Sequence, residues 1–275
     1  MSELTAKIAA SAKTIADRID GDIPKTVLVL GSGLGSFVES MTVNEVIDYS
    51  DIEHFPQPTV QGHEGKLIIG EAGGTPLICM QGRMHAYEGH APRDLAITVR
   101  TFKALGCENL ILTNAAGSVR NDMGPGSLMV IQDHINWCGV NPLIGANDER
   151  DGPRFPDMTQ AYDLELQQQL HSAAKRINKS LFEGVYLMAI GPNFETPAEI
   201  KMFRTLGADA VGMSTVPECL VANHCGMRVA GVSMISNFGA GMGDGKITHD
   251  ETLSEGAKAA GQLSEVLIDF FAHME

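Results

Sequence analysis

The glycine-rich stretch VLVLGSGLGSF, residues 27–37, is the first place where this sequence could do chemistry, because an apolar run ends there in glycines and serines. Glycines let backbone N–H groups approach an anion closely, and Ser32 adds a hydroxyl. The dinucleotide fingerprint G-x-G-x-x-G would need a glycine where Ser36 stands, and a Walker loop would need a lysine that does not follow. The motif alone leaves two interpretations open, a cradle for phosphate and a plain strand-to-helix turn.

The stretch MQGRMHAYEGH, residues 80–90, is a second candidate, because it also follows an apolar run. Arg83, His85 and Tyr87 alternate, so an extended backbone would point all three side chains to one side. An arginine, a histidine and a phenol on one face favour a site for an oxyanion and a hydroxyl, although a solvated loop with one salt bridge has the same composition. His63 in GHEGKL is weaker evidence by itself, since a single loop histidine is more often structural or simply exposed.

The stretch GPNFETPAEI carries residues that suit a heteroaromatic ring. Thr196 and Glu199 have the spacing of a capping box, so a helix should begin there. Phe194 and Glu195 then lie just before the helix, where the phenyl ring could stack on a ligand and the carboxylate could accept ring N–H groups. Asn237, after an apolar run, offers one donor and one acceptor and suits a lactam-like edge, although asparagine is also a common turn residue.

Two further stretches place small or polar residues after apolar runs. In DAVGMSTVPE, Ser214 lies near a predicted helix N-terminus, where anions are favoured, and Thr215 and Glu218 have the spacing of a second capping box. Met213 could pack on a ligand, although core packing is its commoner role. In LTNAAGS, a buried strand is predicted to end at Asn114, and the small residues after it would either let a flat ligand lie against the backbone or make a tight turn.

Together, these stretches supply groups for one anion, for hydroxyls and for one heteroaromatic ring, which are the parts of a phosphate, a sugar and a base. They make no provision for a second phosphate or a hydride carrier. No metal-ligand cluster and no Ser-His-Asp or Cys-His arrangement stands out in the sequence.

The composition narrows the class of protein. The 275 residues carry a formal net charge of −14, which argues against a nucleic-acid or acidic-membrane partner, because phosphate backbones are bound mainly by lysine and arginine. Five cysteines, an odd number without a C-x-x-C pair, favour free thiols in a reducing compartment and hence a cytoplasmic location. We expect neither a membrane span nor a signal peptide, because no apolar run reaches about 18 residues.

Short apolar runs that alternate with helical patterns must position these groups. Predicted strands cover residues 26–30, 67–70, 76–80, 109–113, 127–131, 185–190, 209–212 and 228–235. Predicted helices cover residues 3–19, 92–105, 160–177, 197–206, 216–225 and 251–273. Fully apolar strands indicate a sheet covered on both faces, and the alternation indicates an α/β fold with mixed pairing. We expect one domain over residues 1–275, with the turn-rich loop 141–159 contacting a ligand or a partner.

Eight motifs, in order across nearly the whole chain, resemble those of the trimeric purine nucleoside phosphorylases. They are LGSGLG, GHEGKL, QGRMHAYEG, LTNAAGS, RFPDMTQAYD, GPNFETPAE, AVGMSTVPE and SMISN. The resemblance implies a single α/β domain with a mixed, partly barrel-like central sheet flanked by helices. It also implies a homotrimer that catalyses reversible phosphorolysis of purine (deoxy)ribonucleosides to free base and (deoxy)ribose 1-phosphate in purine salvage. Inorganic phosphate is then a co-substrate, and neither a metal nor another cofactor is expected.

The same resemblance implies roles for individual residues. Catalysis is assigned to Asn237, Glu195 and His85. The phosphate ligands are assigned to Ser32, His63, Arg83, His85, Ser214 and the backbone N–H of Ala115. The nucleoside contacts are assigned to Tyr87, Ala116, Gly117, Phe194, Glu195, Val211, Met213 and Asn237. His249, in KITHDET, would meet the ribose 5′-hydroxyl, and Phe155, in RFPDM, would enter the pocket of a neighbouring subunit.

Glu195 and Asn237 decide the predicted choice of base. By resemblance, this pair suits 6-oxopurines, as in inosine and guanosine, whereas relatives that act on 6-aminopurines carry an aspartate at the base-recognition position. A bacterial relative that accepts xanthosine has a tyrosine two residues before G-P-N-F-E-T, where this chain has Ala189. That difference lowers the expectation for xanthosine without removing it.

Two hypotheses from other classes stay open at this point. A nicotinamide-dependent dehydrogenase rests only on the opening glycine loop, and Ser36 and the lack of a clear strand-end acid near residues 50–55 count against it. A non-catalytic nucleoside-binding protein would not need Arg83, His85, Glu195 and Asn237 together, so their joint presence argues against it.

Overall fold

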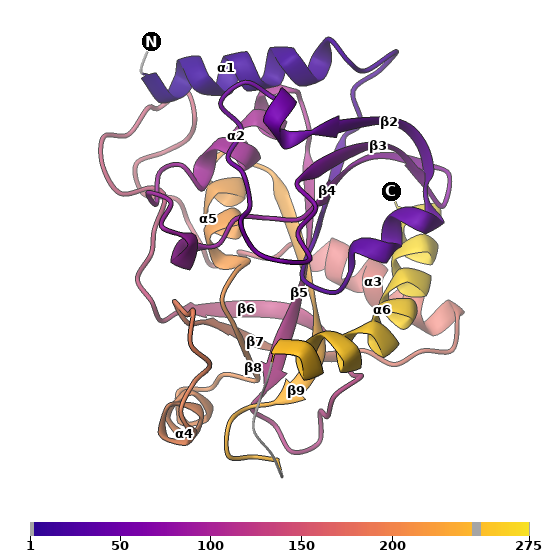
Figure 1. Cartoon of the computed structure of the whole chain (residues 1–275), viewed down its shortest axis with the longest axis vertical. Helices are drawn as coiled ribbons and strands as arrows, with labels where there is room; N and C mark the ends of the chain where they lie inside the picture. The colour runs from indigo at the N-terminus through magenta and orange to yellow at the C-terminus, as the bar shows by residue number, and fades with distance from the viewer. Residues whose placement is uncertain (1–2, 244–248, 275) are drawn as a thin grey trace.

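The computed structural model describes residues 3–243 and 249–274, with the side chains of residues 249–258 outside that description. Within this part, nine strands form one mixed sheet in the order β2-β3-β4-β1-β5-β8-β7-β6-β9 (Figure 1). The strands are β1 (Thr26–Leu30), β2 (Thr42–Asp48), β3 (Lys66–Ala72), β4 (Thr75–Gln81), β5 (Asn109–Ser118), β6 (Leu128–Asn136), β7 (Phe182–Met188), β8 (Ala210–Gly212) and β9 (Arg228–Phe238). Because β5 pairs with β9 as well as with β8, the run β5-β8-β7-β6-β9 closes into a barrel. The predicted α/β fold with a mixed, partly barrel-like sheet is confirmed.

Four of the strands end at one edge of the sheet. β1 runs parallel to β4 and to β5, and β5 runs parallel to β9. Their carboxyl ends therefore lie side by side, and ligands of such sheets bind at this edge. The loops after β1 and β4 and the last residues of β5 and β9 carry most of the predicted site residues.

Helices cover the sheet on two sides (Figure 1). They are α1 (Glu3–Ala16), α2 (Ala96–Ala104), α3 (Leu164–Arg176), α4 (Pro197–Thr205), α5 (Val216–His224) and α6 (His249–Ala272), with short 3-10 helices η1 (Gly35–Ser40), η2 (Tyr49–Asp51) and η3 (Ala86–Glu88). Helices α1, α2 and α5 share one core cluster, in which Phe102 is fully buried, and α3 and α6 share another around Phe270. Each buried phenylalanine stabilises the fold by about 1.5–3 kcal/mol. The two clusters hold the site edge between rigid layers.

Every predicted helix and strand is present, with bounds shifted by several residues. The sequence does not predict β2, because most of its side chains are exposed and it lies at the edge of the sheet. The predicted strand end at Asn114 is wrong, because β5 continues to Ser118 through AAGS. Pairing with β8 and β9 gives this stretch of small residues the backbone partners that its sequence does not announce.

Candidate active site

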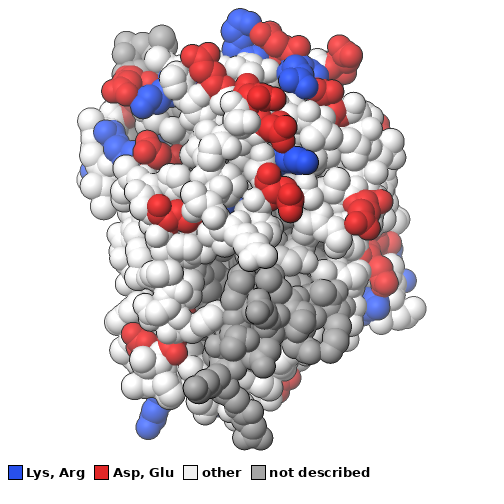
Figure 2. All heavy atoms as spheres, in the orientation of Figure 1, with Lys and Arg blue, Asp and Glu red and all other residues white. Residues whose placement is uncertain are grey.

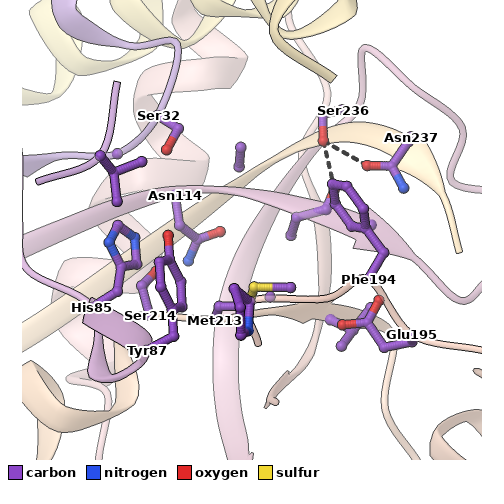
Figure 3. A pocket seen from close by; sticks show the side chains of 18 of the residues that line it. Ser32, His85, Tyr87, Asn114, Phe194, Glu195, Met213, Ser214, Ser236 and Asn237 are labelled. Atoms are coloured by element: carbon purple, nitrogen blue, oxygen red, sulfur yellow. Dashed lines mark hydrogen bonds between the residues drawn. The ribbon is translucent and has the colours of Figure 1, made fainter. Parts of the chain in front are cut away.

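A cavity of about 320 Å³ lies at the edge where β1, β4, β5 and β9 end. Its described lining consists of Gly31, Ser32, Val60, Arg83, His85, Tyr87, Asn114, Ala115, Ala116, Gly117, Pro192, Phe194, Glu195, Val211, Gly212, Met213, Ser214, Ser236 and Asn237. The labelled side chains divide it into two ends, with Ser32, His85 and Ser214 at one and Phe194, Glu195 and Asn237 at the other (Figure 3). We call these the anion end and the base end. A cavity of this volume suits a small molecule with two dissimilar parts.

All but two of the predicted site residues whose side chains the structure describes line this cavity. The exceptions are His63 and Phe155. His63 lies behind Ser32, as described below. His249 is the first residue of α6, and its side chain lies outside the described residues.

Ser32 and His63 form a hydrogen-bonded pair at the anion end. Nδ1 of His63 accepts from the backbone N–H of Arg83 at 2.9 Å, and Nε2 lies 3.0 Å from Oγ of Ser32. Because an acceptor nitrogen carries no proton in a neutral imidazole, the ring proton is on Nε2 and is donated to Ser32. Ser32 can then turn its own hydroxyl proton toward the cavity. A side chain at Gly31 would not fit against β5, since its Cβ would lie 2.7 Å from Cα of Asn114.

Arg83 is a buried cation beneath the anion end. Its side chain is 2% exposed, and Nη1 donates to Oγ of Ser214 at 3.2 Å and to Oγ1 of Thr215 at 3.1 Å. Nη2 donates to the backbone carbonyls of Val29 and Thr113. These bonds fix the guanidinium plane, because its donors point in set directions.

The predicted capping box of Thr215 and Glu218 is wrong. The Thr215 side chain makes no cap hydrogen bond at the start of α5, because its hydroxyl faces Arg83 and Asn114 instead. Oε1 of Glu218 lies 3.4 Å from Nη1 of Arg83 and so compensates the buried charge. Hydrogen-bond and ion-pair partners from distant parts of the chain thus replace the local contacts of the expected cap. In contrast, the predicted capping box of Thr196 and Glu199 at the start of α4 is confirmed.

Glu88 is a supporting residue that the sequence reasoning missed. Its Oε1 accepts from the backbone N–H of His85 at 2.6 Å and lies 3.0 Å from Nδ1 of the His85 ring. Burial alone would raise the pKa of Glu88, but hydrogen bonds from His85 and Thr59 outweigh it and lower the pKa to about 2. With Nδ1 facing this carboxylate, Nε2 is the nitrogen of His85 that can meet a ligand. The spacing of His85 and Glu88 is that of a capping box, which was the available sequence signal.

Met213 lies between the two ends of the cavity, and Tyr87 lies beside His85 at the anion end (Figure 3). The ring of Tyr87 stacks on that of His85, with centroids 4.8 Å apart. Burial raises the pKa of Tyr87 to about 12, so the phenol keeps its proton and can donate it near neutral pH. Gly191 lets the loop after β7 approach both residues, since a Cβ there would lie 2.5 Å from Sδ of Met213.

The amide of Asn237 is held in one orientation at the base end. Oγ of Ser236 donates to Oδ1 of Asn237 at 2.8 Å, and Nδ2 donates to the backbone carbonyl of Phe238 at 2.9 Å (Figure 3). One N–H of the amide remains for a ligand. The sequence does not predict a role for Ser236, because the neighbouring residues of a serine in a buried strand do not indicate which group its hydroxyl will contact.

Phe194 and Glu195 lie opposite this amide, just before α4, as predicted. Phe194 is partly exposed, at 37%, which leaves its ring free to cover a ligand. Burial raises the pKa of Glu195, because the carboxylate loses hydration. A ligand N–H donated to Glu195 would recover that loss.

Phe155 is not among the described residues that line the cavity of its own chain. It is 87% exposed, and the guanidinium of Arg154 lies 5.8 Å from its ring centroid. The loop that carries it is anchored by a hydrogen bond of 2.6 Å from Nη1 of Arg100 to Oδ2 of Asp151. A large apolar side chain is thus presented to the outside on a fixed loop.

On the face in Figure 2, acidic side chains predominate over basic ones. Among the described residues, no helix is long and apolar enough to cross a membrane, and no group of three or more His, Cys, Asp or Glu residues could hold a metal ion.

Comparisons with known proteins agree with this geometry. Residues 25–272 match the phosphorylase superfamily. The chain is 50% identical over 230 residues to purine nucleoside phosphorylase 1 of Bacillus subtilis, which covers 84% of this chain and 85% of that protein. It is 47% identical over 249 residues to purine nucleoside phosphorylase of Bos taurus, with 88% and 86% covered. A crystal structure of a Schistosoma purine nucleoside phosphorylase in complex with hypoxanthine is similar at a TM-score of 0.92 and 34% identity, and 98% of both chains is covered.

Proposed function

This chain belongs to the phosphorylase superfamily and, within it, to the purine nucleoside phosphorylases, and we propose how its cavity divides that reaction between its two ends. The reaction is the phosphorolysis of a purine nucleoside to free base and pentose 1-phosphate. The dehydrogenase and the non-catalytic binding protein, which the sequence left open, are both wrong.

The anion end binds inorganic phosphate in this proposal. Ser32, Ser214 and the backbone N–H of Ala115 donate hydrogen bonds, and Arg83 supplies the buried positive charge beneath them. His85 meets the anion through Nε2, since Nδ1 is occupied by Glu88. A buried cation and several donors in one small volume favour a compact dianion over a neutral ligand.

The base end binds the purine, with the ring of Phe194 stacked on it. The observation that carries the choice of base is the orientation of Asn237, whose Oδ1 is occupied by Ser236 while one N–H remains. A free donor suits the O6 and N7 acceptors of a 6-oxopurine, and the Glu195 carboxylate suits its N1–H. We therefore propose a preference for inosine and guanosine over adenosine.

Catalysis in this proposal comes from holding the reactants and stabilising the leaving base. Bond cleavage leaves positive charge on the sugar and negative charge on the purine. Phosphate fixed beside the anomeric carbon supplies proximity and stabilises the cationic sugar, whose hydroxyls lie near Tyr87 and Met213. Asn237 donates to the departing base, so its bond strengthens in the transition state. Phosphate itself is the nucleophile, with inversion at the anomeric carbon, and no covalent enzyme intermediate forms.

A base-release assay tests this function. Purified protein is given inosine, guanosine, adenosine or xanthosine, each with and without phosphate, and the free base is measured. We expect phosphate-dependent release that is fastest from inosine and guanosine. Asn237→Asp should shift the kcat/KM ratio toward adenosine, because a carboxylate accepts from the 6-amino group. An unchanged ratio would show that Asn237 does not read the base.

We also propose a homotrimer in which Phe155 of one subunit completes the cavity of the next. The support is its 87% exposure on an anchored loop, together with the partly open base end. A single domain over residues 1–275 and a cytoplasmic location remain predictions from the sequence.

A further inference from the structure

Thr215 occupies an unusual position between β8 and α5. It is fully buried, and its backbone has φ 74° and ψ −48°, a region that β-branched residues rarely adopt. Such a strained conformation persists only where other contacts demand it. Glycine would adopt this conformation freely, so the contacts of the threonine side chain must account for a threonine at this position.

The Thr215 hydroxyl has three polar neighbours, which together determine the direction in which its proton points. Nδ2 of Asn114 donates to Oγ1 at 2.8 Å, and Nη1 of Arg83 donates to it at 3.1 Å. These two donors fill both acceptor positions of a hydroxyl oxygen. The remaining neighbour is Oγ of Ser214 at 3.1 Å, so the Thr215 proton is donated to Ser214.

The same count of donors and acceptors determines where the hydroxyl proton of Ser214 points. Its Oγ accepts from Thr215 and from Nη1 of Arg83 at 3.2 Å, which fills both of its acceptor positions. Its own proton is therefore left for the phenolic oxygen of Tyr186, which also accepts from the backbone N–H of Ser214 at 3.2 Å, or for an anion, because Ser214 lines the anion end of the cavity (Figure 3). We propose that Thr215 is a positioning residue that makes Ser214 a hydrogen-bond donor toward phosphate. This inference rests on the proposed placement of phosphate at the anion end.

The arrangement parallels that of Ser32, which accepts from Nε2 of His63 and so also turns its proton to the cavity. Two serines are thus set as donors before the anion arrives, and neither needs to reorient when it binds. Preorganised donors of this kind cost little reorganisation energy on binding. Thr215 itself does not line the cavity, and from the sequence it is expected only as a helix cap with Glu218.

Steady-state kinetics of three Thr215 variants test the inference. Thr215→Val removes the hydroxyl and keeps the shape, and we expect it to raise the phosphate KM about tenfold, as for a loss of about one directed hydrogen bond. The inosine KM should change less than twofold. Thr215→Ser should restore the phosphate KM to near its original value. Thr215→Gly, which the backbone conformation tolerates, should raise the phosphate KM even if Thr215→Val folds poorly.

Thr101→Val is the matched control. Thr101 is a fully buried threonine of α2 whose hydroxyl oxygen has no hydrogen-bond partner in the described part of the chain. It should leave the phosphate KM unchanged. A similar rise in this variant would mean that any buried threonine hydroxyl matters, which would overturn the specific role of Thr215.

A double-mutant cycle with Ser214→Ala separates positioning from general structure. If Thr215 acts through Ser214, adding Thr215→Val to Ser214→Ala should raise the phosphate KM no further. Effects that multiply, or an unchanged phosphate KM in Thr215→Val, would overturn the inference. If Ser32→Ala raises the phosphate KM and Ser214→Ala does not, Ser214 does not donate to phosphate. The inference about Thr215 then fails, while the placement of phosphate at the anion end stands. If neither variant raises it, the placement of phosphate is wrong.

Discussion

The carboxylate of Glu88 joins His85 to Thr59, and thereby joins the two loops that flank the anion end of the cavity. Oε1 lies 2.6 Å from the backbone nitrogen of His85, and Oε2 accepts from the hydroxyl of Thr59 at 2.6 Å and from its backbone N–H. Val60, next to Thr59, lines the cavity. One buried side chain therefore sets both the histidine ring and the neighbouring wall.

Replacing Glu88 by glutamine should impair phosphate use. The neutral amide cannot accept from all four donors, so His85 loses its fixed ring orientation. We expect a fall of about 10–100-fold in kcat/KM for phosphate, in the range of a mispositioned catalytic group. Glu149→Gln, at an exposed glutamate, is the control. Equal kinetics for the two variants would contradict the role of Glu88.

The same carboxylate should make stability depend on pH in acid. Its pKa is lowered from 4.5 to about 2 in the folded chain, so it contributes stability that is full above about pH 4.5 and is lost as the pH falls toward 2. The shift corresponds to roughly 3 kcal/mol. Urea unfolding of the wild type and Glu88→Gln at pH 7, 5 and 3 should show a difference that shrinks at pH 3. A constant difference would rule this linkage out.

Ser236→Ala should relax the discrimination between 6-oxo- and 6-aminopurines. Without the donor at 2.8 Å, only the bond from Nδ2 to the carbonyl of Phe238 holds the amide, which can then rotate to present Oδ1 as an acceptor to the base. We expect the ratio of kcat/KM for inosine over adenosine to fall about tenfold, the effect of about 1.4 kcal/mol. The phosphate KM is the internal control and should stay constant. A ratio within twofold of wild type would mean that Ser236 does not orient the amide.

Ser32→Ala should raise the phosphate KM and leave the inosine KM unchanged. The variant removes one donor at the anion end, which is expected to cost about tenfold in affinity when the acceptor is charged. Its partner His63 then keeps the bond from Arg83 but loses the one to Ser32. An unchanged phosphate KM would show that the loop after β1 does not hold the anion.

Phe155→Ala should raise the inosine KM without dissociating the proposed trimer, because we propose that the side chain enters a neighbour's cavity. Size-exclusion chromatography with light scattering checks the assembly. Refolding Phe155→Ala together with Asn237→Ala should recover activity, since mixed trimers pair an intact cavity with an intact Phe155. No recovery above the two variants refolded separately would place Phe155 in its own subunit or outside the site.

Local signals explain what could be predicted from the sequence. The capping box of Thr196 and Glu199 marks the start of α4, and the apolar run at 26–30 marks β1, because each depends on residues within a few positions of one another. The order of the motifs along the chain predicted the family, and the family resemblance predicted most of the residues that line the cavity. The edge strand β2 escaped prediction because its exposed side chains carry little periodic signal.

The sequence by itself determined the α/β class, the positions of its helices and most of its strands, and which side chains had the chemistry for phosphate, sugar and base. Only the tertiary structure decided which of these side chains meet a ligand and which hold others in place. Thr215 and Glu218 look like a local cap, yet they serve Arg83, which is 132 positions from Thr215 in the chain. The physical reason is that a hydroxyl or a carboxylate takes the donors that folding brings to it, and those donors come from distant parts of the chain.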